Sequence, residues 1–281
     1  MESVDLALLR QSLLAMLRED VGTGDITSRA TIPANALATA RYVSKQAFVV
    51  AGIAAIQEIV RLVDADLSFK ALVTDRASVQ KGAALAELRG SARSILTVER
   101  TSLNLLQRMC GIATLTRQYV ERVQGTRARI IDTRKTVPGL RVLDKYAVTC
   151  GGGINHRMGL FDGVLIKNNH LAFHPSPSKA IEEARRHVGH LVKIEVEVRS
   201  LDELTTALGA GADVVLLDNF TPELTRQAVA LVAGRVPLES SGGITLDTVR
   251  SFAETGVDYI SVGALTHSAP AVDIHLRVTP D

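Results

Sequence analysis

The stretch LVKIEVEVRSLDELTTALGAGADVVLLD (residues 191–218) places two short apolar runs on either side of a helical pattern. The runs at 191–198 and 213–218 are rich in residues that favour strands, and apolar residues at 201–208 recur at helical spacing. A strand, a helix and a second strand with short links form a parallel pair with a right-handed crossover. The stretch therefore predicts a βαβ unit, the building block of α/β folds.

The same alternation extends from about residue 128 to near the end of the chain. Short apolar runs recur at 128–132, 162–167, 191–198, 213–218, 235–240 and 258–263. Helical patterns separate several of them, at 178–187, 201–208, 222–232 and 246–255. This repetition is compatible with an α/β barrel or with a doubly wound open sheet.

The residues that close these apolar runs favour the barrel. They are polar or small: Asp132, Lys167, Glu197, Asp218, Ser241 and Gly263. Chemical groups at the C-terminal ends of many strands are typical of barrels. A dinucleotide-binding sheet would have G-x-G-x-x-G between a strand and a helix, and the sequence contains no such motif.

Residues before about 110 show a different order of elements. Helical patterns occur near 5–19, at 53–63 and at 91–109, and strand-like stretches occur near 37–50, 67–73 and 83–88. The regular strand–helix alternation of the later part is missing here. This part of the chain is therefore expected to be a separate α+β unit.

Charge and composition exclude several classes of partner. The chain has 32 Lys and Arg against 30 Asp and Glu, which is too balanced for a general nucleic-acid or membrane-surface binder. The longest apolar run, at 47–56, is shorter than the ~18 residues that a membrane span needs. The N-terminus carries acidic residues and an amphipathic pattern rather than the basic and apolar segments of a signal peptide. A cytoplasmic location is therefore expected.

The two cysteines, Cys110 and Cys150, lie far apart without a CxxC pattern. This spacing argues against a structural zinc site and against a secreted disulfide framework. Both thiols are expected to be inert packing residues.

Two glycine-containing segments late in the chain predict a phosphate site. SSGGI (240–244) and SVGAL (261–265) each follow an expected strand. Glycine lets the backbone approach an anion closely, and loops after the last strands of a barrel commonly bind phosphate.

Basic residues are concentrated between Arg127 and Lys167, with eight Lys and Arg against three acidic residues. Arg134 and Lys135 follow the run that ends at Asp132, and His156 and Arg157 follow the glycine-rich CGGGIN. Such positions would point into a barrel mouth, where arginine can bind carboxylates or phosphates with two hydrogen bonds. A pocket for a polyanion is favoured over a solvated basic face.

Carboxylates occur on two neighbouring strands. Glu195 and Glu197 share one strand face because they are two residues apart, and Asp218 ends the next strand. Above a phosphate site, such a pair indicates either Mg²⁺ or a contact with ribose hydroxyls. Glu197, nearer the strand end, is the better-placed ligand, and Glu195 is expected to be a buried partner of Lys193 or Lys167.

Several strings of the sequence resemble the quinolinate phosphoribosyltransferase family. The longest is DTRKTVPGLRVLDKYAVTCGGGINHRMGLFDGVLIKNNH (132–170), a polar stretch of a length that chance agreement rarely produces. Agreement continues at 19–28, 99–114, 194–198, 216–220, 239–244 and 255–268, so that it covers essentially the whole chain.

The resemblance implies an N-terminal α/β sandwich domain (1–112), to which the chain end can return, and an incomplete α/β, TIM-like barrel (113–281). It also implies a homodimer. The implied reaction transfers phosphoribosyl from 5-phosphoribosyl 1-pyrophosphate to quinolinate with decarboxylation, giving nicotinate mononucleotide, pyrophosphate and CO₂ in NAD biosynthesis. Mg²⁺ is the implied cofactor.

The resemblance also implies roles for individual residues. The quinolinate carboxylates would contact Arg100 of the partner subunit, Arg134, His156, Arg157 and Lys167. The phosphoribosyl pyrophosphate would contact the catalytic set Lys135, Lys167, Glu197 and Asp218, the last two also holding Mg²⁺. Its 5-phosphate would lie on Ser241, Gly242, Gly243, Gly263 and Ala264, and Thr133 and Val262 complete the substrate-binding set.

One departure from the family pattern is Asn168 in KNNH, where an acidic residue is more usual. A related branch associated with molybdenum transport diverges after the lysine strand, and the intact LIKNNH and CGGGINHR argue against it. Two other functions stay open. Lys167 could serve a Schiff-base aldolase, and the same scaffold could be a sensor that binds phosphorylated metabolites without turnover.

Overall fold

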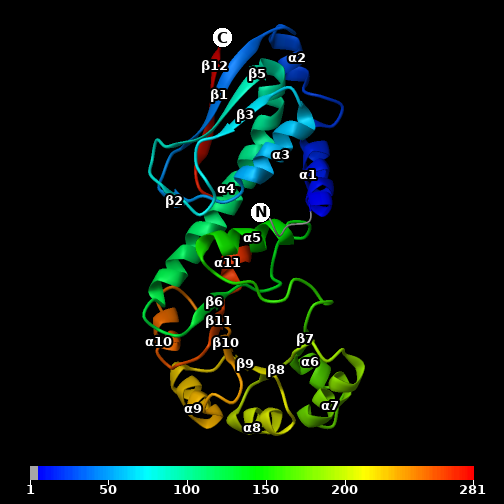
Figure 1. Ribbon diagram of the computed structural model, residues 1–281, viewed down its shortest axis with the longest axis vertical. Helices are drawn as coiled ribbons and strands as arrows, with labels where there is room; N and C mark the ends of the chain where they lie inside the picture. Colours follow the sequence, from blue (N-terminus) through cyan, green and yellow to red (C-terminus); the bar gives the residue numbers. More distant parts are fainter. Residues whose placement is uncertain (1–5) are drawn as a thin grey trace. The chain divides into compact units, whose positions relative to one another are not determined.

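The computed structural model describes residues 6–281, with side chains from Leu9 onward (Figure 1). The chain divides into two compact units. The first extends to Arg117 and also includes Thr136–Gly152 and Thr266–Asp281, and the second consists of Gln118–Lys135 and Gly153–Leu265. The expected start of the first helix near residue 5, and the first five residues of the predicted domain 1–112, lie outside the described residues. The predicted division at 112/113 stays a prediction.

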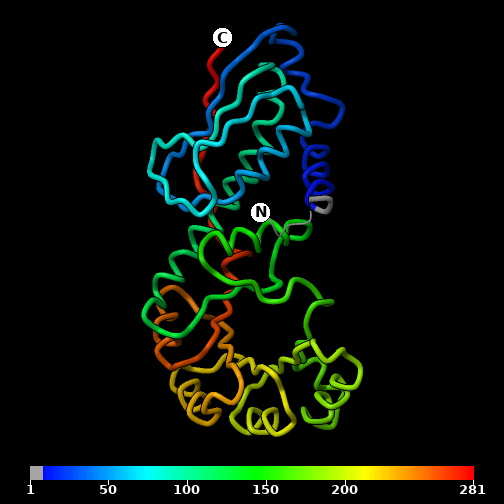
Figure 2. Tube along the Cα trace, in the orientation of Figure 1, coloured from blue at the N-terminus to red at the C-terminus, as the bar shows by residue number. Residues whose placement is uncertain are grey.

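The first unit contains a four-stranded sheet in the order β12-β1-β5-β3. The antiparallel partners of β1 (Leu37–Ser44) are β5 (Ala84–Ser91) and β12 (Ile274–Pro280), and β3 (Ser68–Ala71) pairs with β5. The C-terminal strand therefore runs beside a strand from the start of the chain (Figure 2). β2 (Phe48–Val49) and β4 (Ser78–Val79) form a separate pair.

The helices of the first unit are α1 (Leu6–Val21), α2 (Ile26–Thr31), α3 (Ile53–Val63), α4 (Ala92–Arg122), which continues into the second unit, and α5 (Arg141–Gly151). The prediction at 53–63 is confirmed, whereas the helix predicted at 91–109 is longer. Gly111 lies inside α4 at a close packing contact, where a Cβ would lie 2.1 Å from the carbonyl oxygen of Pro270.

Both cysteines are free and buried in the first unit. Burial raises the pKa of the Cys110 thiol to about 12 and that of Cys150 to about 11. Such thiols carry almost no thiolate at neutral pH, which is the nucleophilic form.

The second unit contains a six-stranded parallel sheet in the order β6-β11-β10-β9-β8-β7. All six strands fall within the predicted runs or overlap them: β6 (Arg129–Ile131), β7 (Val164–Ile166), β8 (Ile194–Val198), β9 (Val214–Asp218), β10 (Leu238–Ser241) and β11 (Tyr259–Ser261). The crossover helices are α7 (Pro177–His187), α8 (Leu201–Gly209), α9 (Pro222–Val232) and α10 (Val249–Ala253). Short helices α6 (Asn168–Leu171) and α11 (Ala264–His267) follow β7 and β11.

The helix predicted at 246–255 is shorter than expected. A turn precedes it, in which the Thr248 hydroxyl accepts a hydrogen bond from the Thr245 backbone N–H at 3.0 Å. At its other end, the Glu254 N–H donates to the Arg250 carbonyl and Gly256 follows with φ of +89°. These two turns confine α10 to Val249–Ala253.

The two faces of this sheet differ. Strand alternation puts Ile194, Val196 and Val198 on one face of β8, and α7 and α8 contact this strand. Glu195 and Glu197 point to the other face, where the strand register also places acidic or polar residues of the neighbouring strands: Asp218, Glu239 and Ser241. We call this second face the inner face.

The sheet of the second unit is not closed by strand pairing. Among the described residues, β6 and β7 do not pair with each other, and the free side of β6 carries only an isolated bridge between Ile131 and Ile154. This is an open α/β barrel with its helices on the outside, and together with the smaller sheet of the first unit it confirms the predicted fold class.

Among residues 6–281, none of the helices has the combination of length and apolar character that crossing a bilayer requires.

Candidate active site

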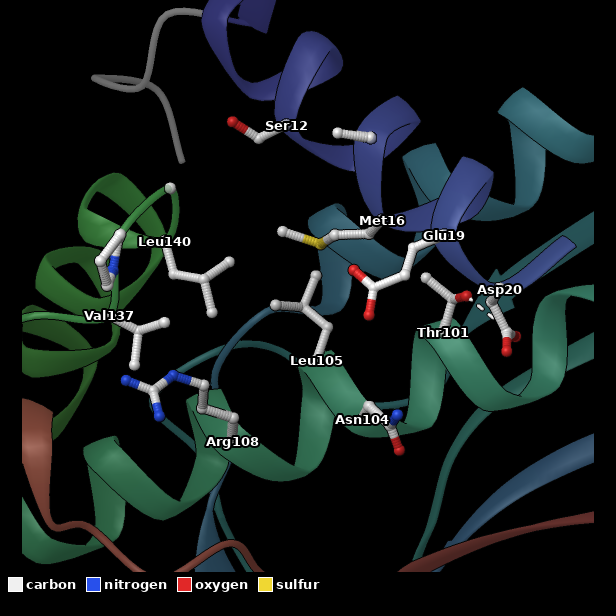
Figure 3. A pocket seen from close by; sticks show the side chains of 13 residues that line it. Ser12, Met16, Glu19, Asp20, Thr101, Asn104, Leu105, Arg108, Val137 and Leu140 are labelled. Carbon is white, nitrogen blue, oxygen red and sulfur yellow. Dashed lines mark hydrogen bonds between the residues drawn. The ribbon is translucent and has the colours of Figure 1, made fainter. Parts of the chain in front are cut away.

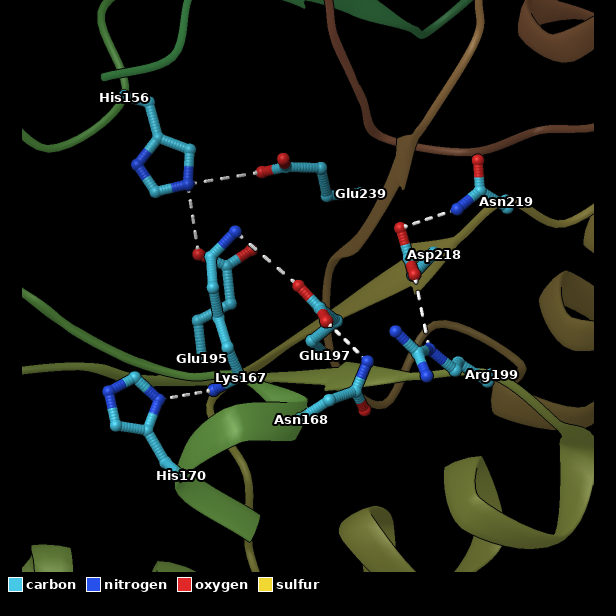
Figure 4. Close-up of polar contacts among 10 residues, drawn as sticks. All are labelled: His156, Lys167, Asn168, His170, Glu195, Glu197, Arg199, Asp218, Asn219 and Glu239. Carbon is cyan, nitrogen blue, oxygen red and sulfur yellow. Dashed lines mark hydrogen bonds and ion pairs between the residues drawn. The ribbon is translucent and has the colours of Figure 1, made fainter. Parts of the chain in front are cut away.

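Polar side chains from the carboxyl ends of neighbouring strands lie along one edge of the six-stranded sheet (Figure 4). Asp218 is in register with Ser241, and Ser241 is in register with Ser261. Lys167 follows β7 directly and lies beside Glu197. Glu197 is in register with Leu216, which lies two residues before Asp218 on β9. We call Lys167, Glu197, Asp218 and Ser241 the strand-end rim.

Glu197 lies between two donors at the rim. Its Oε2 is 3.4 Å from the Lys167 Nζ, and its Oε1 accepts a hydrogen bond of 2.7 Å from the Asn168 amide. The Glu197 side chain is only 9% exposed, whereas that of Lys167 is 49% exposed. The carboxylate is therefore held in place, while the lysine keeps freedom to contact a ligand.

Asp218 has a similar pair of donors. Its Oδ2 lies 3.3 Å from the Nε of Arg199, which follows β8, and its Oδ1 accepts from the side-chain amide of Asn219 at 3.0 Å. The Arg199 side chain is 60% exposed. Asp218 thus presents a carboxylate at the rim, next to an exposed cation.

Two glycine-containing turns leave neighbouring strands at the same edge. Gly242 and Gly243 both have positive φ, of +104° and +62°, and a Cβ on Gly242 would lie 2.2 Å from Asn219 Oδ1. The second turn, Val262–Ala264, follows β11, and the Val262 N–H donates to the Ile131 carbonyl. The strand register therefore brings together the two segments predicted to bind phosphate.

A buried aspartate anchors the segment that carries His156. Asp132, at the end of β6, is fully buried. It accepts hydrogen bonds from the Asn155 amide at 2.6 Å and from the His156 backbone N–H at 2.9 Å. The sequence DTRK therefore contributes a structural carboxylate as well as the cations that follow it.

The His156 ring contacts protein groups through both nitrogens. Its Nδ1 accepts from the Arg157 backbone N–H at 2.6 Å, and its Nε2 lies 3.1 Å from Glu195 Oε2 and 3.5 Å from Glu239 Oε2 (Figure 4). The ion-pair partner of Glu195 is thus His156, and Lys167 pairs with Glu197 instead. The expectation of a lysine partner for Glu195 is wrong, because Lys167 comes level with Glu197 in the register.

Glu239 is the most strongly perturbed acid of this region. It is 3% exposed, and burial together with the charge of Glu195 raises its pKa well above the ordinary carboxyl value. We call His156, Glu195 and Glu239 the buried acid cluster. Their ligand atoms all lie within 4.8 Å of one another. Glu195 and Glu239 are two strands apart, about 9–10 Å in a flat sheet, so the inner face curves inward.

Arg157 is positioned next to this cluster. Its Nη1 donates to the Gly163 carbonyl at 2.8 Å, while its Nε is buried with no hydrogen-bond partner among the described residues. Burial and the nearby charge of Arg134 lower the pKa of the Arg157 guanidinium. Two adjacent arginines and an unused buried donor favour an anionic ligand.

The remaining predicted residues are distributed between the two units. Thr133 accepts from the Lys135 backbone N–H at 3.0 Å, and Lys135 is exposed. Arg100 is exposed on α4 of the first unit. The second unit by itself therefore contains every predicted substrate-binding residue except Arg100.

Sequence reasoning did not single out Glu239 or Arg199, and it noted Asn168 only as a departure from the family pattern. A signal existed for Glu239, an acidic residue inside the apolar run VPLES two places before Ser241, which puts both on one strand face. Asn168 and Arg199 each follow a strand end, but exposed polar residues after strands are too common to stand out.

A separate cavity lies in the first unit (Figure 3). It measures about 660 Å³ and lies between α1, α4 and the 137–140 segment. On its wall, Arg108 binds Asp144 through two hydrogen bonds of 2.9 and 2.7 Å. None of the predicted site residues lines it.

Known proteins similar to this chain agree on one family. Residues 25–110 match "Quinolinate phosphoribosyl transferase, N-terminal domain", and residues 112–277 match "Quinolinate phosphoribosyl transferase, C-terminal domain". The chain is 44% identical to the "Probable nicotinate-nucleotide pyrophosphorylase [carboxylating]" of Bacillus subtilis (strain 168), over 96% of this chain and 93% of that protein. The "Nicotinate-nucleotide pyrophosphorylase [carboxylating]" of Mycobacterium leprae (strain TN) is also 44% identical, over 95% and 96%.

Solved structures give the same result. The crystal structure of NadC from Streptococcus pyogenes superposes with a TM-score of 0.95 at 39% identity, covering 99% of both chains. The nicotinate-nucleotide pyrophosphorylase from Francisella tularensis gives a TM-score of 0.92 at 40% identity, covering 99% of this chain and 98% of that one. The chain belongs to the quinolinate phosphoribosyltransferase family.

Proposed function

We propose that this protein transfers the phosphoribosyl group of 5-phosphoribosyl 1-pyrophosphate to quinolinate, with loss of CO₂, to form nicotinate mononucleotide and pyrophosphate. Relatives from Nicotiana tabacum that are 39–41% identical carry the name quinolinate phosphoribosyltransferase [decarboxylating]. The observation that carries the proposal is the strand-end rim, where two carboxylates and a lysine lie beside two glycine-containing turns.

The rim offers a complete set of contacts for the phosphoribosyl donor. The 5-phosphate binds the backbone of the Ser241–Gly243 turn and the neighbouring Val262–Ala264 turn, where glycine allows close approach. Glu197 and Asp218 face the ribose hydroxyls and the pyrophosphate. Lys135 and Lys167, which are both exposed, neutralise the charge that builds on the leaving pyrophosphate.

The donor set at the rim fits Mg²⁺. Glu197 and Asp218 supply carboxylate oxygens, which Mg²⁺ prefers, on neighbouring strands of one face. Their cationic neighbours, Lys167 and Arg199, are about half exposed or more, so they can move aside. When bound with the substrate phosphates, Mg²⁺ would stabilise negative charge on the pyrophosphate as a Lewis acid.

The acid substrate binds on the arginine side of the site. Arg134, Arg157 and Lys167 carry positive charges that match the two carboxylates of quinolinate. Thr133 and His156 directly precede the two arginines in the chain. Arg100 is contributed by the second subunit of a homodimer, in a cytoplasmic enzyme.

The reaction needs no nucleophilic side chain. The pyridine nitrogen forms a bond to C1 of the ribose as the bond from C1 to pyrophosphate breaks. The resulting pyridinium accepts the electron pair of the bond to the 2-carboxylate, which leaves as CO₂, and a proton takes its place on the ring. The protein contributes orientation and charge stabilisation.

The test is CO₂ release from quinolinate labelled at the 2-carboxylate, in the presence of phosphoribosyl pyrophosphate and Mg²⁺. Release that depends on all three components and equals the nicotinate mononucleotide formed is expected. Binding of both substrates without release would indicate a sensor instead. Borohydride trapping of Lys167 with a carbonyl substrate would indicate the aldolase.

A further inference from the structure

The buried acid cluster is built from three distant parts of the second unit. Glu195 lies on β8, Glu239 on β10, and His156 on the segment anchored by Asp132. The two carboxyl groups are 10% and 3% exposed, and their ion-pairing partner among the described residues is His156 alone. The Ser261 hydroxyl and the charge of Lys167 also favour ionised Glu239, but burial and the charge of Glu195 outweigh them, so the two acids need another way to share charge.

Hydrogen positions follow from the geometry of the cluster. The Arg157 backbone N–H donates to His156 Nδ1, so that nitrogen carries no hydrogen, and the ring hydrogen lies on Nε2 facing Glu195. Burial and the charge of Glu195 raise the pKa of Glu239, which favours its protonated form. The two carboxyl groups converge on His156 Nε2 at 3.1 and 3.5 Å, so that a proton on Glu239 is placed to be shared with Glu195. Glu195 thus accepts hydrogen bonds from both neighbours.

We propose that Glu239 is a positioning residue for the acid substrate: through Glu195 it fixes the His156 ring, and the ring fixes the backbone of Arg157 at the barrel mouth. This role rests on the function proposed above and deepens it. The buried Nε of Arg157, which has no partner among the described residues, is the donor whose position depends on this chain of contacts. The Ser241–Gly243 turn follows Glu239 along β10, but among the described residues the Glu239 carboxyl group contacts His156 and Glu195 and makes no hydrogen bond to that turn.

Two substitutions at Glu239 separate hydrogen bonding from packing. Glu239→Gln stays neutral and keeps a donor for Glu195, so the KM for quinolinate should remain within about twofold of the wild-type value. Glu239→Leu has a similar volume but no donor, and it should raise that KM about tenfold. The KM for phosphoribosyl pyrophosphate should be unchanged in both. Ser240→Ala, one residue along β10 and on the opposite face, is the matched control.

A spectroscopic measurement makes the test independent of turnover. With ¹⁵N-labelled histidine, and the His156 signals assigned by their loss in His156→Gln, the wild-type enzyme and Glu239→Gln should show the Nε2–H tautomer. Glu239→Leu should shift these signals. If no CO₂ is released from quinolinate, the proposed function fails, and the histidine signals still decide whether Glu239 fixes the ring.

Three results would overturn the proposal. Unchanged His156 signals in Glu239→Leu would show that the ring does not depend on Glu239. An equal rise in both KM values with a large drop in thermal midpoint would indicate a purely structural role. Stoichiometric binding of Zn²⁺ that removes the Nε2 hydrogen, and that is lost in Glu239→Gln, would make the cluster a cation site instead.

Discussion

The strand-end rim and the buried acid cluster use the same residue type on the same sheet face for different purposes. Glu197 lies at the strand end between the Lys167 ammonium and the Asn168 amide. Glu195, two residues earlier on β8, and Glu239 on β10 lie against the His156 ring instead. Glu239 is level with Glu197 in the register, because both are paired with Leu216, yet burial and the charge of Glu195 raise the pKa of Glu239 well above the ordinary carboxyl value. The groups around each carboxyl group therefore decide its chemistry, and depth along the strand alone does not.

The largest expected effect is at the rim. Glu197→Ala removes a carboxylate that contacts the donor substrate and Mg²⁺, and kcat/KM should fall about 10²–10³-fold. Steady-state kinetics with both substrates measures this, and Asp202→Asn, an exposed acid on α8, is the control. If Glu197→Ala retained kinetics close to the control, the rim would not be the reaction site.

The rim, unlike the buried cluster, is expected to need a second subunit. Arg100→Ala and Lys167→Ala should each be inactive, because each removes one charge from every site. A hybrid dimer would contain one intact site, so a mixture with free subunit exchange should regain about a quarter of the wild-type activity. If no activity returned although mass spectrometry confirmed subunit exchange, the site would not combine Arg100 of one subunit with Lys167 of the other.

In the buried cluster, Glu239→Gln should change the pH dependence of stability while leaving the kinetics close to those of the wild-type protein. The pKa of Glu239 is raised in the folded protein, so its contribution to stability is full below the ordinary carboxyl pKa near 4.5 and declines as pH rises toward the folded value. Glu239→Gln does not titrate. Its advantage over the wild-type protein should therefore grow above about pH 4.5, by at most about 1.4 kcal/mol per pH unit.

Urea unfolding of both proteins at several pH values between 5 and 8 measures this difference. Glu121→Gln, an exposed glutamate on α4, is the matched control. A difference between Glu239→Gln and wild type that stayed constant over this range would show that Glu239 is ionised in the folded state.

The smallest effect is expected where the chain departs from its family. Asn168 donates to Glu197 at 2.7 Å, and Asn168→Asp replaces this donor by a negative charge beside the rim. The Mg²⁺ concentration for half-maximal activity should fall about threefold, because an added negative charge attracts the cation. Asn169→Asp, the exposed neighbour, is the control. A higher Mg²⁺ requirement would show that Asn168 positions Glu197 in a way that aspartate cannot replace.

Much of the second unit could be predicted from local pattern. All six strands appeared as apolar runs because buried parallel strands have few polar residues. Strand periodicity alone placed Glu195 and Glu197 on one face, and the two glycine-containing turns could be recognised from the sequence. The lengths of α4 and α10 were less predictable, since α4 continues through Gly111 and a turn at Thr245–Thr248 delays the start of α10.

By itself, the sequence determined the strand–helix rhythm, the residue types at the strand ends and the resemblance to a family. Only the tertiary structure decided which residues meet. His156 contacts Glu195 and Glu239 because strand order and inward curvature bring β8, β10 and the 153–157 segment together. Likewise, β12 pairs with β1 although almost the whole chain separates them. Local propensity acts between near neighbours, whereas register and partner choice are set by the burial of the whole sheet.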